Sequence, residues 1–318
     1  MTVLTDLEDL AKQLDGFPFF ATIGYFDGVH LGHRALAEQT AHRASEQGYA
    51  SVIITLDHHP QEVLRPDLPP PDCLMSLQNK LRILGQLPGD AILLLRFTKE
   101  LAAETPEQFL RPLIEIGLKG LVLGYDNRFG RRELHVTLNQ FDDRIRSQGV
   151  SVHRISRVYV GDEGVSSTAI RAYIRSGDFE KAARMLGRPY SFVGDVVSGS
   201  QIGRTLSYPT ANIRPIDPHL VMPEDGIFVS EVKVGEYVYP AMAYYGCRPT
   251  IAPDLEHQLE AFLFGYSGSL YGRQVEIAFR SFLRQDIAFA TREELAQQLV
   301  RDEAATKSYF ADHALVLR

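Results

Sequence analysis

The amino-acid sequence predicts two domains of unlike class: an α/β domain with a parallel sheet, then a small antiparallel β-barrel with a C-terminal helix. The chain has 318 residues. A single hydrophobic core usually supports a domain of roughly 100–200 residues, so this length predicts two domains. Its first half alternates apolar runs with helical patterns, whereas its second half is a series of short strands and tight turns. We expect the domains to span residues 1–185 and 186–318, with the border after the helical segment DFEKAARML.

Short apolar segments rich in Val, Ile and Leu are the expected strands of the first domain. They occupy residues 19–25, 51–56, 91–97, 120–125 and 151–156, with helical patterns at 33–48, 76–87 and 106–117. Continuous apolar strands separated by helices indicate a parallel sheet covered on both faces. Ligands of such sheets bind beyond the carboxyl ends of the strands. The proline-rich segment 58–73 is expected to be an extended or mobile loop beside that edge.

The second domain should be built from closely spaced antiparallel strands. Strand patterns lie at residues 191–199, 226–246, 259–266 and 273–283, and the Gly235-Glu236 pair fits a tight hairpin turn. This spacing is typical of a small barrel. The segment 291–310 reads as a closing helix, with Thr291 as its N-cap and Glu294 three residues on.

Composition restricts the location of the protein and the class of its partners. The net charge of -7 argues against nucleic acid as the main partner, because clustered Lys and Arg hold a phosphate backbone. Cys73 and Cys247 form no CxxC pair, so neither a disulfide framework nor a cysteine-based zinc site is expected. The N-terminus lacks signal-peptide features, and no apolar run reaches the ~18–20 residues of a membrane span. A cytoplasmic protein without a membrane partner is the expectation.

A glycine-rich segment follows the first predicted strand of the α/β domain and opens the next helix, at residues 24–36. Gly24, Gly28 and Gly32 permit a tight turn and close approach of a phosphate to the backbone. The free N–H groups of a helix start form an anion site there. His30 and His33 are three residues apart, hence on one helix face, where each can donate a hydrogen bond to a polyphosphate.

Other interpretations of this histidine pair remain open. Two histidines near a glycine-rich turn are often capping or surface residues, and zinc is a further alternative, although no third ligand is evident at a useful spacing. A strand-to-helix junction is the context that phosphate binding requires, which favours the nucleotide interpretation.

A second hydroxyl-rich helix start lies near the end of the first domain. Ser166, Ser167 and Thr168 can cap a helix or hold phosphate. Arg171, one turn further along, can reach the same anion. A plain N-cap beside a solvated arginine is the alternative.

These segments resemble a known family. His30-Leu31-Gly32-His33 is similar to the (H/T)xGH signature of the nucleotidyltransferase superfamily, and residues 24–33 resemble the longer G-x-F-D-G-V-H-x-G-H of the adenylyltransferase module of bacterial FAD synthetases. TLDHHP (55–60), GYDNRFG (124–130) and VSSTAIR (165–171) resemble further segments of that module in the same order. The resemblance implies a Rossmann-like nucleotidyltransferase domain that joins the α-phosphate of ATP to FMN, giving FAD and pyrophosphate.

The resemblance also implies roles for individual residues. His30, His33 and Arg171 would be the catalytic donors, with Mg²⁺ neutralising the leaving pyrophosphate. Asp27 and Asp126 would hold nucleotide or metal rather than act as bases. The nucleotide-binding set would comprise Gly24, Phe26, Asp27, Gly28, Asp126, Ser166, Ser167 and Thr168.

The second half resembles riboflavin kinases. The segment 194–213 carries Gly203, Arg204 and Thr205, followed by Pro209-Thr210-Ala211-Asn212, and is similar to the G-R-x-L-G-F-P-T-A-N segment of that family. An ordinary loop between barrel strands is the alternative. The resemblance implies nucleotide binding by the three residues at 203–205 and Mg²⁺ ligation by Thr210 and Asn212, whose oxygens suit that ion.

A glutamate completes the second predicted site. Glu260, in the stretch LEAFLFGYSGSLYG (259–272), takes the place of the family's catalytic Glu. It would accept the proton of the ribityl 5′-hydroxyl as riboflavin is phosphorylated to FMN. A glutamate on an amphipathic strand is otherwise more often solvent-facing.

Several positions depart from the family patterns: His58, Asn79, Asn127, Ser207, Tyr244, Phe262 and Gly265. They fall mostly where a base or a flavin ring would pack, so an enzyme with one live site, or a flavin- or nucleotide-binding regulator without turnover, remains an alternative. The leading prediction is a bifunctional enzyme whose partners are riboflavin, FMN, FAD, ATP and pyrophosphate, with weak self-association left open.

Overall fold

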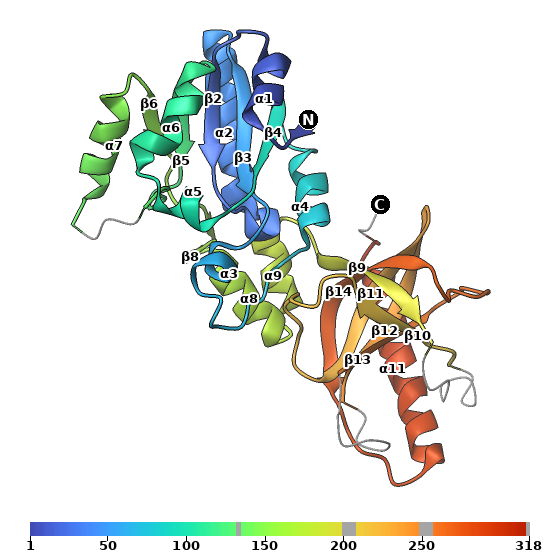
Figure 1. The fold of residues 1–318 in the computed structure, drawn as a ribbon. Helices are drawn as coiled ribbons and strands as arrows, with labels where there is room; N and C mark the ends of the chain where they lie inside the picture. Colours follow the sequence, from blue (N-terminus) through green and yellow to red (C-terminus); the bar gives the residue numbers. More distant parts are fainter. Residues whose placement is uncertain (132–134, 199–207, 248–256, 316–318) are drawn as a thin grey trace. The chain divides into compact units, whose positions relative to one another are not determined.

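A computed structural model describes residues 1–131, 135–198, 208–247 and 257–315 (Figure 1). Contacts divide the chain into two compact units. One comprises Met1–Cys73 and Leu77–Ser166, and the other comprises Leu74–Ser76 and Ser167–Arg318. By this division, the helices Ser167–Arg175 and Phe179–Leu186 belong to the second unit. The expected domain border between residues 185 and 186 stays a prediction. Within the described residues, no helix combines the length and the apolar character that crossing a membrane requires.

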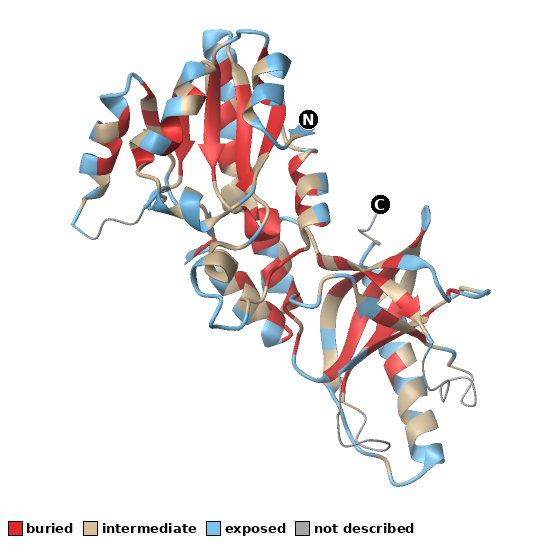
Figure 2. Cartoon of the chain, viewed as in Figure 1, coloured by how far each residue is buried: buried red, intermediate tan, exposed pale blue. Residues whose placement is uncertain are grey.

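The first unit contains the predicted parallel sheet, which is confirmed. Its strands are β1 (Thr2–Leu4), β2 (Phe19–Ile23), β3 (Ala50–Leu56), β4 (Ala91–Leu95), β5 (Leu118–Leu123) and β6 (Ser151–Arg154). They lie in the order β1-β4-β3-β2-β5-β6, and every pair is parallel. Figure 2 shows the central strands buried along most of their length, and every residue of β2 is buried. The short strand β1 was not predicted.

Helices cover this sheet. They are α1 (Leu7–Leu14), α2 (Leu31–Gln47), α3 (Pro60–Leu64), α4 (Leu77–Leu84), α5 (Lys99–Ala103), α6 (Pro106–Glu115) and α7 (Leu138–Arg146), and a small hairpin of β7 (Tyr159–Val160) and β8 (Glu163–Gly164) follows. Residues of α1, α6 and α7 share one apolar core with β2–β6. Helix α2 contacts β2, β3 and β5 through other residues. The carboxyl ends of β2 and β3, where a ligand is expected, lead into α2 and α3.

The proline-rich segment 58–73 is not wholly irregular, which corrects the prediction. It contains the helix α3, with Pro60 at its first position. A proline is tolerated there because the first N–H groups of a helix have no intrahelical acceptor. His59 caps this helix: its Nδ1 accepts from the N–H of Gln61 at 3.1 Å, while Glu62 Oε1 accepts from the N–H of His59 at 3.1 Å.

The second unit contains the predicted antiparallel barrel, which is also confirmed. Its strands are β9 (Tyr190–Val197), β10 (Ala211–Pro215), β11 (Gly226–Val234), β12 (Tyr237–Gly246), β13 (Gln258–Leu263) and β14 (Gln274–Gln285). They close in the order β10-β13-β12-β11-β14-β9. The predicted two-residue turn joins β11 to β12, with Gly235 at φ 63°. Strand β10 was not predicted as a separate element.

Helices α8 (Ser167–Arg175), α9 (Phe179–Leu186) and α11 (Arg292–Asp312) complete the second unit. Thr291 caps α11 by accepting from the N–H of Glu294 at 3.2 Å, as predicted. A bidentate ion pair joins α11 to the barrel: Arg284 on β14 donates to both carboxylate oxygens of Asp302 at 2.7–3.1 Å. Asp302 is 3% exposed and Arg284 18%, so this pair is shielded from water.

Replacing Asp302 with alanine should lower the free energy of unfolding by about 3 kcal/mol, because the Arg284 guanidinium would be left buried without its counter-ion. Lys307→Ala, which removes an exposed i,i+4 pair with Glu303 on the same helix, is the matched control and should cost about 0.5 kcal/mol or less. Urea denaturation measures both values. Equal losses for the two variants would contradict the structural role of the buried pair.

Candidate active sites

The turn after β2, which carries several of the predicted phosphate-binding residues, has an unusual backbone. Phe26, Gly28 and Val29 have φ values of 57°, 80° and 39°. Such values are uncommon for residues other than glycine, and strained backbone of this kind clusters at functional sites. Phe26 is 1% exposed and Asp27 5% exposed, so the turn is packed into the unit rather than projecting from it.

His30 and His33 lie against each other at the start of α2. Their rings stack with centroids 3.6 Å apart and an interplanar angle of 13°. His30 is the N-cap, and its Nδ1 accepts from the N–H of His33 at 3.3 Å. Nδ1 therefore acts as the acceptor nitrogen, which leaves Nε2 to carry the ring proton and donate it. A Cβ at Gly32 would lie 3.1 Å from Cε1 of His30, so glycine lets the ring approach the helix.

Lys80 is a buried charged residue that the sequence analysis did not assign. It extends from α4 and is 2% exposed. Its Nζ donates to the carbonyl oxygens of Tyr25 at 3.0 Å and Leu56 at 2.7 Å, just beyond the end of β2 and at the last residue of β3. It also lies 4.0 Å from the centroid of the Tyr25 ring. Burial lowers the pKa of Lys80 to about 8, although the charges of Asp27 and Asp57 oppose that shift.

Lys80 should therefore make folding stability depend on pH. Between pH values of about 8 and 10.5, the unfolded chain holds a proton on this amine that the folded chain has lost, so stability rises with pH there. The difference in unfolding free energy between the wild type and Lys80→Met should grow across this window by up to about 3 kcal/mol, at about 1.4 kcal/mol per unit of pKa. Urea denaturation at several pH values tests this, and a difference that stays constant would contradict it.

The turn after β5 approaches the end of β2 through an amide side chain. Asn127 Nδ2 donates to the carbonyl oxygen of Ile23 at 2.7 Å. Arg154 Nη1 donates to the carbonyl oxygens of Gly124 at 2.6 Å and Asn127 at 3.1 Å. Asp126 lies between Gly124 and Asn127, the residues that these hydrogen bonds hold. Its side chain is exposed and therefore accessible to a ligand. The turn that differs from the family pattern is thus held by hydrogen bonds at both ends.

The hydroxyl cluster falls at the division between the units. Ser166 ends the first unit, and Ser167 begins both the second unit and helix α8, on which Thr168 and Arg171 also lie. The predicted helix start is confirmed. That these residues join His30 and His33 around one phosphate stays a prediction.

The second predicted site gathers three oxygen-bearing side chains, from the residue just before β10, from β10 and from β13. Thr210 Oγ1 donates to Glu260 Oε2 at 2.8 Å. Asn212 and Glu260 are directly opposite in the antiparallel register, which places their side chains on the same side of the sheet. Glu260 is 3% exposed, so it is not the solvent-facing glutamate of the alternative. A hydroxyl, an amide and a carboxylate form a hard donor set that fits a divalent cation such as Mg²⁺.

Comparison with known proteins shows which family the chain belongs to. The family model described as FAD synthetase matches residues 16–169, and the model described as riboflavin kinase matches residues 186–310. The Escherichia coli bifunctional riboflavin kinase/FMN adenylyltransferase is 34% identical over 293 residues, which cover 91% of this chain and 92% of the relative. The chain belongs to the family of bifunctional riboflavin kinases/FMN adenylyltransferases.

Other known proteins are similar to the chain over most of its length. The protein of the same name from Listeria monocytogenes is 30% identical over 91% of each chain. A solved structure named as a macrolide-efflux protein from Streptococcus pneumoniae has a TM-score of 0.81 and 28% identity, covering 96% of this chain and 98% of that one. The likeness therefore extends over both units and not over a single module.

Phe262, one of the departures from the family pattern, packs against aromatic partners in the barrel. Tyr208 donates from its hydroxyl to Glu303 Oε2 at 2.6 Å, and its ring meets that of Phe262 edge-on at 5.0 Å. Burial, together with this hydrogen bond, raises the pKa of Tyr208 to about 12. Gly265 has φ 75° with no atom within 4 Å of an added Cβ, so it serves a turn in open space. Of the predicted nucleotide-binding residues, Gly203, Arg204 and Thr205 lie outside the described residues.

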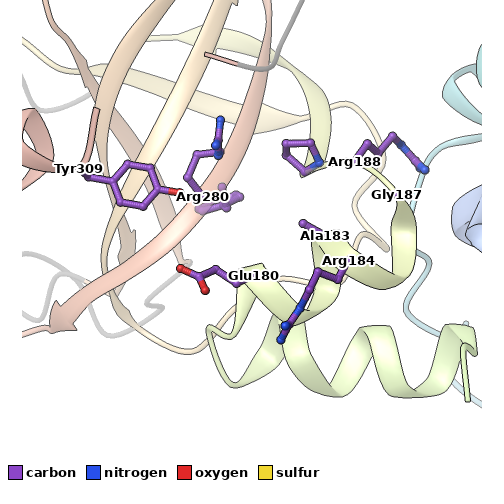
Figure 3. Close-up of a pocket in the computed structure, with 9 residues that line it drawn as sticks. Glu180, Ala183, Arg184, Gly187, Arg188, Arg280 and Tyr309 are labelled. Carbon is purple, nitrogen blue, oxygen red and sulfur yellow. The ribbon is translucent and has the colours of Figure 1, made fainter. Parts of the chain in front are cut away.

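A cavity of about 410 Å³ lies in the second unit (Figure 3). Residues of α9, the following turn, β14 and α11 line it, among them Arg184, Arg188, Arg280 and Tyr309. Arg280 forms an ion pair with the fully buried Glu231. Its guanidinium carbon lies 5.8 Å from the ring centroid of Tyr309. These contacts indicate a structural role for Arg280, and the lining contains none of the residues assigned to either reaction.

Proposed function

We propose that this chain phosphorylates riboflavin to FMN with ATP and then adenylylates FMN with a second ATP to give FAD. One observation carries the proposal: a single chain combines the stacked histidine pair at the start of α2 with the Thr210–Glu260 hydrogen bond of the barrel. The matches to both family models support it. ATP is the co-substrate of both reactions.

In the adenylyl transfer, an oxygen of the FMN phosphate attacks the α-phosphorus of ATP. The bond from that phosphorus to the oxygen bridging to the β-phosphate breaks, and pyrophosphate leaves. Such transfers depend on positioning and charge stabilisation more than on covalent help from the protein. His30 and His33 donate hydrogen bonds to the oxygens that gain negative charge. No protein nucleophile takes part.

In the kinase reaction, Glu260 accepts the proton of the ribityl 5′-hydroxyl as that oxygen bonds to the γ-phosphorus of ATP and ADP leaves. The Thr210 hydroxyl holds Oε2 of Glu260 and so fixes the direction of the carboxylate. Thr210 and Asn212 would hold Mg²⁺, which neutralises charge on the ATP phosphates when bound. A positioned base is worth ~10²–10⁴ in rate.

Mg²⁺ as the metal, and a cytoplasmic location without nucleic-acid or membrane partners, belong to the same proposal. The oxygen donor set of the barrel supports a hard divalent cation. The acidic balance of the chain, with a net charge of -7, supports small-molecule partners.

Labelled ATP separates the two reactions within one experiment. With riboflavin as acceptor, ATP labelled at the γ-phosphate should label both FMN and the FAD made from it, whereas ATP labelled at the α-phosphate should label FAD alone. The double variant His33→Ala/Glu260→Gln, purified in the same way, controls for host enzymes. Label from the γ-phosphate that fails to enter FMN, or label from the α-phosphate that fails to enter FAD, would contradict the corresponding half of the proposal.

A further inference from the structure

Three chemically distinct side chains meet where neighbouring strands of the barrel end. Asp225 immediately precedes β11, Cys247 immediately follows β12, and His257 immediately precedes β13. In the β12–β13 register Gly246 is opposite Gln258, so the next pair outward is Cys247 and His257. In the β11–β12 register Gly226 is opposite Tyr245, which places Asp225 beside Gly246. The barrel itself therefore brings these residues together.

Their geometry is that of metal ligands and their supporting contacts. Cys247 Sγ lies 3.3 Å from His257 Nδ1, and His257 Nε2 lies 2.9 Å from Asp225 Oδ1. One sulfur, one ring nitrogen and one carboxylate oxygen lie within 4.8 Å of one another. The Tyr245 ring stacks on His257 at 5.1 Å with an interplanar angle of 25°, which restrains the imidazole.

The donor set selects a class of ion. A sulfur at ~2.3 Å and a nitrogen at ~2.0–2.1 Å from a tetrahedral Zn²⁺ are separated by roughly 3.5 Å, close to the observed spacing of Cys247 and His257. Thiolate and imidazole favour Zn²⁺ and similar transition ions over Mg²⁺ or Ca²⁺. A thiolate and a carboxylate together also match the charge of a divalent cation. Asp225 and His257 are both exposed and Cys247 is half-buried, so an ion can enter from solvent.

We propose that Cys247 Sγ and His257 Nδ1 bind a divalent transition metal ion of the Zn²⁺ class, with solvent completing the coordination. The Asp225 carboxylate accepts from Nε2 of His257 and so orients the imidazole as an outer partner of the site. The thiol loses its proton to solvent as the metal–sulfur bond forms. The absence of a CxxC pair hid this set from the sequence analysis, because its members are joined by strand pairing and not by a short motif. A bound ion ties together the ends of β11, β12 and β13, and Tyr244 and Glu260 form a cross-strand pair on the last two of these strands.

Cobalt binding tests the proposal on the untagged full-length chain after removal of metals. Co²⁺ alone should produce the ultraviolet charge-transfer absorption of a cobalt–thiolate bond, saturating at one ion per chain. This absorption should be lost in Cys247→Ser. In His257→Ala, which removes a direct ligand, the affinity for Co²⁺ should fall by more than the ~10-fold that loss of an outer hydrogen-bonding partner costs. Cys73→Ser removes the other cysteine of the chain and should leave the absorption unchanged. Zn²⁺ should displace Co²⁺, and a large excess of Mg²⁺ should not.

A wild-type chain without this absorption, or an absorption that survives Cys247→Ser, would overturn the proposal. Displacement by Mg²⁺ would overturn the assignment to a transition metal. The readout is spectroscopic and needs no turnover. Its failure therefore leaves the proposed flavin reactions untouched, just as inactivity in the flavin assays would leave this site untouched. Thermal denaturation of each variant without metal shows whether the barrel is still folded.

Discussion

Replacing His33 with alanine should lower the rate of FAD formation from FMN by ~10²–10³-fold, the usual cost of losing one transition-state donor, and leave FMN formation from riboflavin unchanged. His33 stacks on His30 and meets the Phe26 ring edge-on at 5.1 Å. Its imidazole therefore has a fixed direction at the start of α2. Because the residues proposed for the kinase reaction lie in the barrel, that reaction should have no need of this side chain.

Initial rates with FMN and with riboflavin as separate substrates measure this effect. His42→Ala is the matched control, since it removes a 64%-exposed histidine from the same helix, and it should leave both rates at the wild-type level. Thermal denaturation checks that the His33 variant is folded. An equal fall in both activities, or an equal fall for the His42 variant, would contradict a specific role for His33 in adenylyl transfer.

Replacing Glu260 with glutamine should produce the reverse pattern. FMN formation should fall by ~10²–10⁴-fold, because the variant lacks the base for the ribityl hydroxyl, while FAD formation from supplied FMN should persist. Glutamine keeps the size of the side chain and retains an oxygen that can accept from Thr210. The change therefore removes the charge and the basicity with little disturbance of packing.

Glu236→Gln makes the same chemical change at the exposed β11–β12 turn and should leave both reactions unchanged. Retention of FMN formation by the Glu260 variant would show that another group takes the proton. Loss of FAD formation from supplied FMN to the same extent would contradict separate sites.

Much of the fold follows from local sequence patterns. The continuous apolar runs that form β2, β3 and β4 are typical of parallel strands whose two faces are covered by helices, so their composition predicts them. Strand β1 is not predicted because it has only three residues. Strand β10 is not predicted because its sequence, ANIRP, has no continuous apolar run, and both strands depend on pairing with distant strands. The prolines of the segment 58–73 predict an extended loop, although Pro60 starts a helix.

In the candidate sites, too, residues set by local sequence were predicted, whereas residues set by distant contacts were not. His30 and His33 were found because their geometry is set within one helical turn. Lys80 was not assigned, because its hydrogen bonds reach residues 55 and 24 positions away in the sequence. The hydrogen bond from Asn127 to Ile23 spans 104 positions and was equally hidden. Contacts of this kind arise from the folding of the sheet, and a single sequence carries no local signal for them.

The most direct test of two live sites in one chain is to supply ATP and Mg²⁺ with riboflavin in one reaction and with FMN in another, and to separate the flavins by chromatography. The account predicts FAD in both reactions, with FMN as an intermediate in the first. FAD from FMN alone would mean that the barrel has no kinase activity, and FMN without FAD would mean that the His30–His33 site is inactive; either result would contradict the account.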